Sequence, residues 1–205
     1  MTFIRQALEF KWGTWSLVSL YVSLASGIIV GLQYEYATPF FSATSIDLLI
    51  PFGYFFRSLH FYSSQAFFFF TSIHLVAVFN KTQPYEISEW IRLISTLPII
   101  LLLLFTGYIL RGDSTGASAG AIAESIIESI PLFGASINDI FFSISHEGFR
   151  KVYLHHVITL DLILLILAWN HLRIYRVKLS AQFLPIIFLI VFSVFISAPL
   201  EPEQL

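Results

Sequence analysis

Five apolar runs dominate the chain, and each is long enough to cross a lipid bilayer as one helix. They lie near residues 15–34, 55–79, 91–110, 152–175 and 183–198. About 20 apolar residues form a helix that spans the hydrocarbon core. Single strands could not replace these helices, because their open edges would leave backbone groups unpaired in lipid. Only 12% of the residues are charged, against roughly a quarter in soluble domains. The sequence therefore predicts an all-α integral membrane protein surrounded by membrane lipid.

The segments between the runs predict the orientation of the chain. With five alternating helices, one side receives most of the basic residues, which are Arg5, Lys11, Lys81, Arg92, Arg173, Arg176 and Lys178. Cytoplasmic loops carry an excess of Lys and Arg. We therefore expect the N-terminus in the cytoplasm, or its organelle equivalent, and the C-terminus outside. The net charge of −2 indicates no nucleic-acid partner, and the absence of cysteine excludes disulfides, thiolate metal sites and thioether-linked haem.

Residues 111–150 differ from the apolar runs because they mix Gly and Ser with short amphipathic stretches. In residues 121–130 an Ile/Ala face alternates with Glu124 and Glu128, and Pro131 ends the pattern. A structureless loop of this length would be unusual. We expect one or two short helices lying along the outer surface.

Histidines lie in or at the edge of the predicted spans, where ionisable side chains are rare and usually functional. His60 and His74 are 14 positions apart, about 40° short of four helical turns, so they share one face about 21 Å apart along the axis. His156 and His171 are 15 positions apart, about 60° past four turns. His155 points nearly opposite to His171, so His156 is the better partner.

Two helices with two histidines each, at nearly equal spacing, match bis-histidine ligation of two b-type haems stacked across the membrane. With both axial positions filled, the iron has no open position for substrate, which predicts electron transfer. A lone membrane histidine more often bonds a neighbouring helix, and a zinc site would need ligands that converge at one point. A non-redox transporter or scaffold, the remaining interpretation, predicts no haem.

These motifs resemble the cytochrome b family of quinol-oxidising cytochrome bc complexes over nearly the whole chain. Arg57 stands three residues before His60, and Gly13, Gly27 and Gly107 match glycines that face haem in the family. The stretch "AIAESIIESIPLFGASINDIFF" resembles the family's surface helix pair. The 15-residue histidine spacing and "HLRIYR" are similar to the split, chloroplast-type cytochrome b.

The resemblance implies a ligand set. His60 and His156 would hold an outer, low-potential haem, and His74 and His171 an inner, high-potential one. Arg57 would pair with a haem propionate, although an interfacial anchor is the alternative, and Lys151 falls where the family has another basic residue.

The chain also departs from the family. "RGDS" (residues 111–114) replaces a Pro-Trp-containing motif near the outer quinol pocket, and Leu93 replaces a haem-facing glycine. Asp161 stands where relatives have proline. In a regular helix its face lies about 140° from His156, and it could relay protons or bond a neighbouring helix. Lys11 occupies the cysteine position needed for a covalent third haem.

The implied function is a dihaem cytochrome b subunit carrying electrons across an energy-transducing membrane between quinol and quinone sites. Whether the subunit is itself an enzyme is left open. For the inner quinone site the candidates are Arg176 and Lys178, although the cytoplasmic loop alone would favour basic residues there. For the outer site they are Asp113, Tyr108 and the surface helices at 117–142.

The resemblance implies partner subunits as well: a Rieske iron–sulfur protein, a c-type cytochrome, a subunit supplying the family's C-terminal half, and a homodimer of complexes. The alternative is a dihaem anchor that wires a non-Rieske peripheral oxidoreductase to the quinone pool. We expect residues 1–180 to form a dihaem four-helix domain, and residues 181–205 a fifth transmembrane helix with a short tail.

Overall fold

The described residues of the computed structural model, 11–79 and 85–201, form a helical membrane bundle. In chain order its elements are α2 (Trp12–Gly31), α3 (Pro39–Leu49), α4 (Gly53–Val78), α5 (Ile87–Ile94), α6 (Thr96–Ile109), α7 (Ser114–Glu128), α8 (Gly134–Phe141), α9 (Ile144–Glu147), α10 (Arg150–Leu154), the π-helical turn η2 (His155–Thr159), α11 (Leu160–Ile174), the 3₁₀ turn η3 (Leu179–Ala181) and α12 (Phe183–Phe195). Four stretches of this described part are long and apolar enough to cross a membrane: 12–31, 53–78, 87–109 and 150–174. These four confirm the first four predicted spans.

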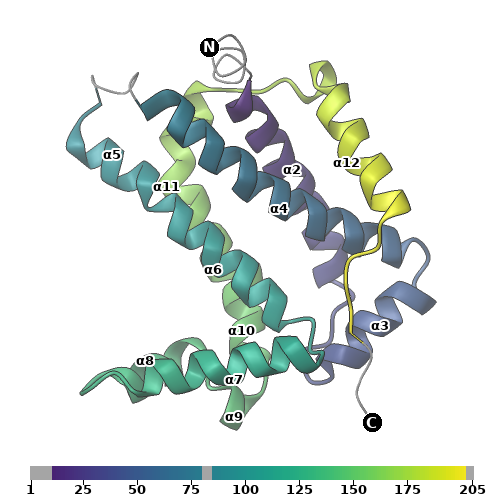
Figure 1. Cartoon of the computed structure of the whole chain (residues 1–205), viewed down its shortest axis with the longest axis vertical. Helices are drawn as coiled ribbons and strands as arrows, with labels where there is room; N and C mark the ends of the chain where they lie inside the picture. The colour runs from purple at the N-terminus through teal and green to yellow at the C-terminus, as the bar shows by residue number, and fades with distance from the viewer. Residues whose placement is uncertain (1–10, 80–84, 202–205) are drawn as a thin grey trace, which may run out of the picture.

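The long helices form two groups (Figure 1). The helices α2, α4 and α12 lie together on one side, and α6 and α11 lie on the other. The helices α7 and α8 run across one end of the bundle, as the amphipathic pattern of residues 111–150 predicted. The short helix α3, which the sequence patterns did not predict, packs against α4 at the same end.

The contact between α2 and α4 is built on serines. Ser16, Ser19, Ser23 and Ser26 repeat at helical spacing and are all buried on one face of α2. Small side chains let two helix backbones approach closely in a membrane. The hydroxyl of Ser16 lies 2.6 Å from that of Thr71 on α4, so the two helices are also hydrogen-bonded to each other.

The centre of the bundle is apolar and draws one buried residue from each of four helices: Leu20, Phe67, Ile100 and Leu164. Phe68 packs against this cluster, whereas Phe69 is 57% exposed. The four consecutive phenylalanines at 67–70 therefore divide between the bundle core and its outer surface.

The third span is interrupted at Ser95, between α5 and α6. Pro98 explains the interruption, because proline has no N–H to donate and its ring clashes with the carbonyl four residues earlier, here that of Ile94. The predicted single helix is therefore two helices in sequence.

The turn between α6 and α7 accounts for "RGDS". Gly112 has a φ of +68°, and a Cβ there would lie 2.5 Å from the backbone nitrogen of Phe40, so only glycine fits. Asp113 caps α7 by accepting a hydrogen bond from the Gly116 amide at 2.9 Å. Arg111 also pairs with Asp113. These residues have a structural explanation that is independent of any ligand.

The fifth predicted span is a short helix followed by extended chain. With 13 residues, α12 is about 20 Å long, less than the roughly 30 Å hydrocarbon core. The extended residues 196–201 then contact α4, where Ser58 accepts a hydrogen bond from the Ala198 amide at 2.9 Å. The Glu201 amide finally donates to Asp113 at 3.0 Å. Helix and extended segment together run from one end of the bundle to the other (Figure 1).

Candidate haem-binding site

The four histidines singled out by spacing meet in two pairs, one above the other. The ring centres of His60 on α4 and His156 on η2 are 6.2 Å apart, with an angle of 88° between the ring planes. Those of His74 on α4 and His171 on α11 are also 6.2 Å apart, at 60°. Imidazole nitrogens bind metal ions at about 2 Å, so two imidazoles on opposite sides of one metal ion have ring centres about 6 Å apart. Both pairs therefore have the separation that one intervening iron requires.

The π-helical turn η2 aligns the second histidine of each pair. A π turn inserts one extra residue into an α-helix, and η2 comprises His155–Thr159. With one residue absorbed, the 15-residue spacing between His156 and His171 acts as 14, about 40° short of four turns. This is the angle between His60 and His74, so the faces of α4 and α11 match more closely than regular-helix arithmetic predicted.

Second partners fix the ring nitrogens of the first pair. The Nδ1 of His60 lies 2.9 Å from the carbonyl of Ser23, to which it donates. The Nδ1 of His156 lies 2.9 Å from the Thr106 hydroxyl, which itself donates to the Leu102 carbonyl. A histidine that donates from Nδ1 presents Nε2 as its metal-binding atom. Both rings of this pair are thus held in the tautomer that an iron ligand needs.

Glycines lie directly against three of the four rings. A Cβ at Gly27 would stand 2.8 Å from His60, one at Gly13 2.9 Å from His74, and one at Gly107 3.0 Å from His156. The separations at Gly27 and Gly13 are shorter than Cβ contacts in proteins, and the separation at Gly107 is tighter than most of them. A larger residue at any of these three positions would displace a histidine ring of a pair.

The fourth ring has a different environment. His171 packs against Tyr175, with ring centres 4.6 Å apart. Leu93 stands at the position where the resemblance implied a fourth glycine. The two histidine pairs are therefore not equivalent in their surroundings.

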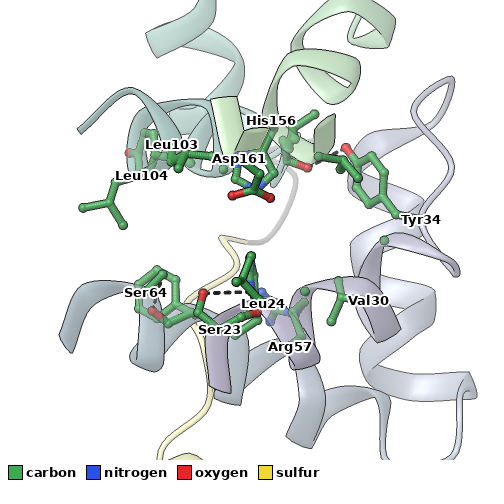
Figure 2. Close-up of a pocket in the computed structure, with 18 of the residues that line it drawn as sticks. Ser23, Leu24, Val30, Tyr34, Arg57, Ser64, Leu103, Leu104, His156 and Asp161 are labelled. Atoms are coloured by element: carbon green, nitrogen blue, oxygen red, sulfur yellow. Dashed lines mark hydrogen bonds between the residues drawn. The ribbon is translucent and has the colours of Figure 1, made fainter. Parts of the chain in front are cut away.

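A cavity of about 220 Å³ opens beside the first pair, between the two groups of helices (Figure 2). His60 and Gly27 line it from one group, and His156 and Gly107 from the other. Its lining is mainly apolar, which suits a largely hydrophobic macrocycle. The glycine contacts, the oriented imidazoles and this cavity together fit a b-type haem at His60 and His156.

Arg57 lines the same cavity, but its guanidinium already has partners. Its Nε donates to Asp47 at 2.6 Å, a second nitrogen pairs with the same carboxylate, and the Ala198 carbonyl accepts a further bond at 2.9 Å. Asp47, on α3, was not singled out from the sequence, because the helix that carries it was not anticipated.

The other candidates are dispersed. Tyr108 lines the cavity beneath the Arg111 guanidinium, 4.7 Å from its ring centre. Lys151 pairs with Asp139 and Glu147. Arg176 and Lys178 are exposed in the connection from α11 to α12, which lies at the end of the bundle opposite α7 and α8 (Figure 1). The predicted quinone residues therefore divide between the two ends.

Asp113 is 2% exposed and saturated with hydrogen bonds. Burial alone would raise the pKa of Asp113, but bonds from the Glu201 amide, Arg111 and the Gly116 amide outweigh it and hold the pKa below its ordinary value. Its observed partners make it a junction between chain segments rather than an open proton acceptor.

Asp161 differs from its expected orientation, and two residues that orient the histidines were not anticipated. Because η2 adds a residue, Asp161 lies about 40° from His156, not about 140°, and it lines the same cavity. The ring of His155 lies against α8, with Nε2 3.0 Å from the Ile140 carbonyl, and points away from the pair as expected. Thr106 and Ser23, which orient the histidines, carry no spacing signal that could have identified them.

A membrane-spanning helical bundle with paired histidines defines a membrane haem protein. A family model described as cytochrome b/b6/petB matches residues 4–178, and the chain belongs to this family of haem-b-binding membrane proteins. Cytochrome b6 of Heliomicrobium gestii is 25% identical over 178 residues, covering 82% of this chain and 83% of that protein. Cytochrome b of Dictyostelium citrinum is 25% identical over 137 residues, covering 63% of this chain and 35% of that protein.

The fold is also similar to that of a solved structure. A chain of a hyperthermophilic respiratory Complex III matches with a TM-score of 0.70 and 23% sequence identity. The match covers 90% of this chain and 58% of that one, so this chain spans little more than half of that chain's length. The likeness shows a shared fold.

Proposed function

We propose that this chain is a dihaem cytochrome b subunit that carries electrons across an energy-transducing membrane, between quinol and quinone sites of a bc-type complex. The observation that carries the proposal is the arrangement of four histidines in two pairs, His60 with His156 and His74 with His171, each with ring centres 6.2 Å apart. Bound haem supplies reversible one-electron chemistry. His60 with His156, and His74 with His171, would hold the two irons about 21 Å apart along the helix axis.

Other residues of the chain would orient the ligands, exclude water, and contact a haem propionate and a quinone. The Nδ1 bonds to Ser23 and Thr106 keep the first pair oriented, and the apolar cluster of Leu20, Phe67, Ile100 and Leu164 keeps water out of the space between the pairs. Arg57 would offer a propionate part of its guanidinium, shared with Asp47. Arg176 and Lys178, exposed at the other end, would attract a quinone at the inner site.

The proposed assembly has a Rieske iron–sulfur protein, a c-type cytochrome and a subunit that supplies the C-terminal half of the family's quinol site, with two complexes forming a homodimer. To test it, the complex is purified natively, its α-band is titrated against potential, and its subunits are identified by mass spectrometry. Two haem transitions together with a Rieske protein support the proposal. A molybdenum, iron–sulfur or multihaem partner without a Rieske protein contradicts it.

One observation favours the alternative of a dihaem anchor for a different peripheral oxidoreductase. Asp113, the acidic candidate for outer quinol oxidation, already accepts hydrogen bonds from Arg111, Gly116 and Glu201. Either assembly needs two haems, and the co-purifying subunits separate the two possibilities.

The ligand assignment is tested residue by residue. His74→Ala is expected to remove one haem and leave the other, because its partner His171 then has no opposing imidazole. His155→Ala is the matched control, since its ring contacts α8 and not the cavity. Haem content per protein, measured by the pyridine haemochrome absorbance, should fall by half in the first variant and stay unchanged in the second. Loss of haem from His155→Ala would overturn the choice of His156.

A further inference from the structure

Asp161 is a carboxyl group near the middle of a membrane span, and the structure gives it no partner. It belongs to the first turn of α11 and is half-buried. Within the described part of the chain it takes part in no hydrogen bond or ion pair. Its carboxyl group points into the cavity that His60 and His156 line (Figure 2). Ionisable groups at this depth are costly and mark functional sites by default.

Asp161 reaches the cavity only because of the π-helical turn. Without η2 it would face away from His156, whereas with one residue absorbed it lies on nearly the same face, one helical turn further along. The alternative role expected for it, a hydrogen bond to a neighbouring helix, is not what the described residues show.

The other charged and ionisable groups that line the cavity already have partners or a proposed role. Arg57 from α4 pairs with Asp47, and Arg111 after α6 pairs with Asp113. Tyr34, Tyr108 and Tyr153 also line the cavity. Tyr34 and Tyr153 donate their hydroxyl protons to the carbonyls of Leu110 and Gly31, and the Tyr108 ring lies beneath the Arg111 guanidinium. His60 and His156 are the proposed iron ligands. Among the residues that line the cavity, Asp161 is the one carboxyl group.

We propose that Asp161 is the proton acceptor coupled to the haem held by His60 and His156. It takes up one proton from water when that haem gains one electron, and it releases the proton when the electron leaves. The electron comes from quinol or, in a titration, from a chemical mediator. The inference rests on the proposed dihaem function.

The physical reason is charge compensation in an apolar space. An added electron and a carboxylate repel each other strongly where little water screens them, and one proton on the carboxylate cancels that repulsion. The arginines cannot respond in this way, because a guanidinium stays protonated in proteins. Among the residues that line the cavity, Asp161 is thus the group that can bind a proton when the haem is reduced.

The test is a potentiometric titration of both haems in the native complex at several pH values. One proton taken up per electron changes the reduction equilibrium tenfold per pH unit, which is about 59 mV. We expect the midpoint potential of the outer haem to fall as pH rises, with a slope that approaches this value. In Asp161→Asn the midpoint potential of the outer haem should depend much less on pH. Asp161→Glu, which keeps the carboxyl group, should restore the slope. The inner haem, held by His74 and His171, is the internal control and should keep its slope in every variant.

An unchanged slope for the outer haem in Asp161→Asn, with both haems bound, would overturn the inference while leaving the dihaem function standing. Absence of two haems from the unaltered complex would instead contradict the proposed function. If Asp161→Asn does not assemble, the inference can still be tested on the unaltered complex. Reduction of the outer haem should then produce the infrared C=O absorption of a protonated carboxyl, shifted by ¹³C-aspartate labelling, and its absence would also overturn the inference.

Discussion

At the scale of single residues, the first histidine pair is more rigidly built than the second. His60 and His156 each hold a hydrogen bond through Nδ1, to Ser23 and Thr106. Such outer partners orient a ligating imidazole and increase its basicity. Because Thr106 donates its own proton to the Leu102 carbonyl, it is free to accept from His156. Ring orientation at this site is therefore fixed before any iron arrives.

Gly27→Ala is expected to disturb the outer haem selectively. The added Cβ would stand 2.8 Å from His60, and the hydrogen bond to Ser23 limits how far the ring can retreat. Overpacking of this kind costs about 1–3 kcal/mol, which corresponds to roughly 5- to 150-fold in affinity. Retention of each haem during detergent washing, followed by its α-band, measures the effect.

Gly31→Ala is the matched control on the same helix. Its Cβ would meet only the Tyr153 hydroxyl, at 3.8 Å, an ordinary contact. Equal loss of haem from the two variants would mean that helix flexibility, and not the approach to His60, explains the glycine.

At the scale of elements, the π turn is the feature that brings the helices into register. We expect deletion of Val157, inside η2, to convert the turn into regular α-helix and to retain both haems. His156 and His171 would then be 14 residues apart, about 40° short of four turns as before. An alanine inserted after Leu162 should instead rotate His171 by about 100° and abolish one haem. Absorbance-based haem counts on purified variants test both; loss of the outer haem on deleting Val157 would show that η2 itself is required.

The sequence was informative where one interaction decides the outcome. Apolar run length predicted the four long spans, and histidine spacing predicted which side chains meet. It failed where tertiary contacts decide. The π turn is not visible in periodicity, so Asp161 was assigned to the wrong face. The Arg57–Asp47 pair depends on α3, a helix whose position follows from packing against α4.

At the scale of the whole molecule, Asp113 ties three distant segments together. It binds Arg111 at the end of α6, caps α7 through the Gly116 amide, and accepts the Glu201 amide of the C-terminal segment. We expect Asp113→Asn to destabilise the protein by about 1–3 kcal/mol, because buried donors lose a charged acceptor. Thermal unfolding in detergent and proteolysis of the C-terminal segment measure this. Asp139→Asn is the control: its side chain is 76% exposed, and exposed ion pairs contribute about 0–1 kcal/mol.

The same junction should respond to acid. The pKa of Asp113 in the folded protein lies below its ordinary value of 3.8. Its contribution to stability is therefore complete above that ordinary value and is lost as pH falls through the lowered folded value. Release of the C-terminal segment to protease should need pH below about 4, and this acid step should be missing in Asp113→Asn. An acid step that persists in the variant would assign it to another group.

Orientation of the molecule in its membrane is testable because the chain contains no cysteine. Ser129 directly follows α7, Ser180 lies in η3 between α11 and α12, and both are exposed. The helices α7 and α8 run across one end of the bundle, and the connection from α11 to α12 lies at the other end (Figure 1). The excess of Lys and Arg on the side of Ser180 predicts that this end faces the cytoplasm. A membrane-impermeant maleimide should therefore label Ser129→Cys and spare Ser180→Cys when it is added from outside, with the reverse result in inverted vesicles. Labelling of Ser180→Cys from outside would reverse the assignment, and with it which histidine pair lies nearer the cytoplasm.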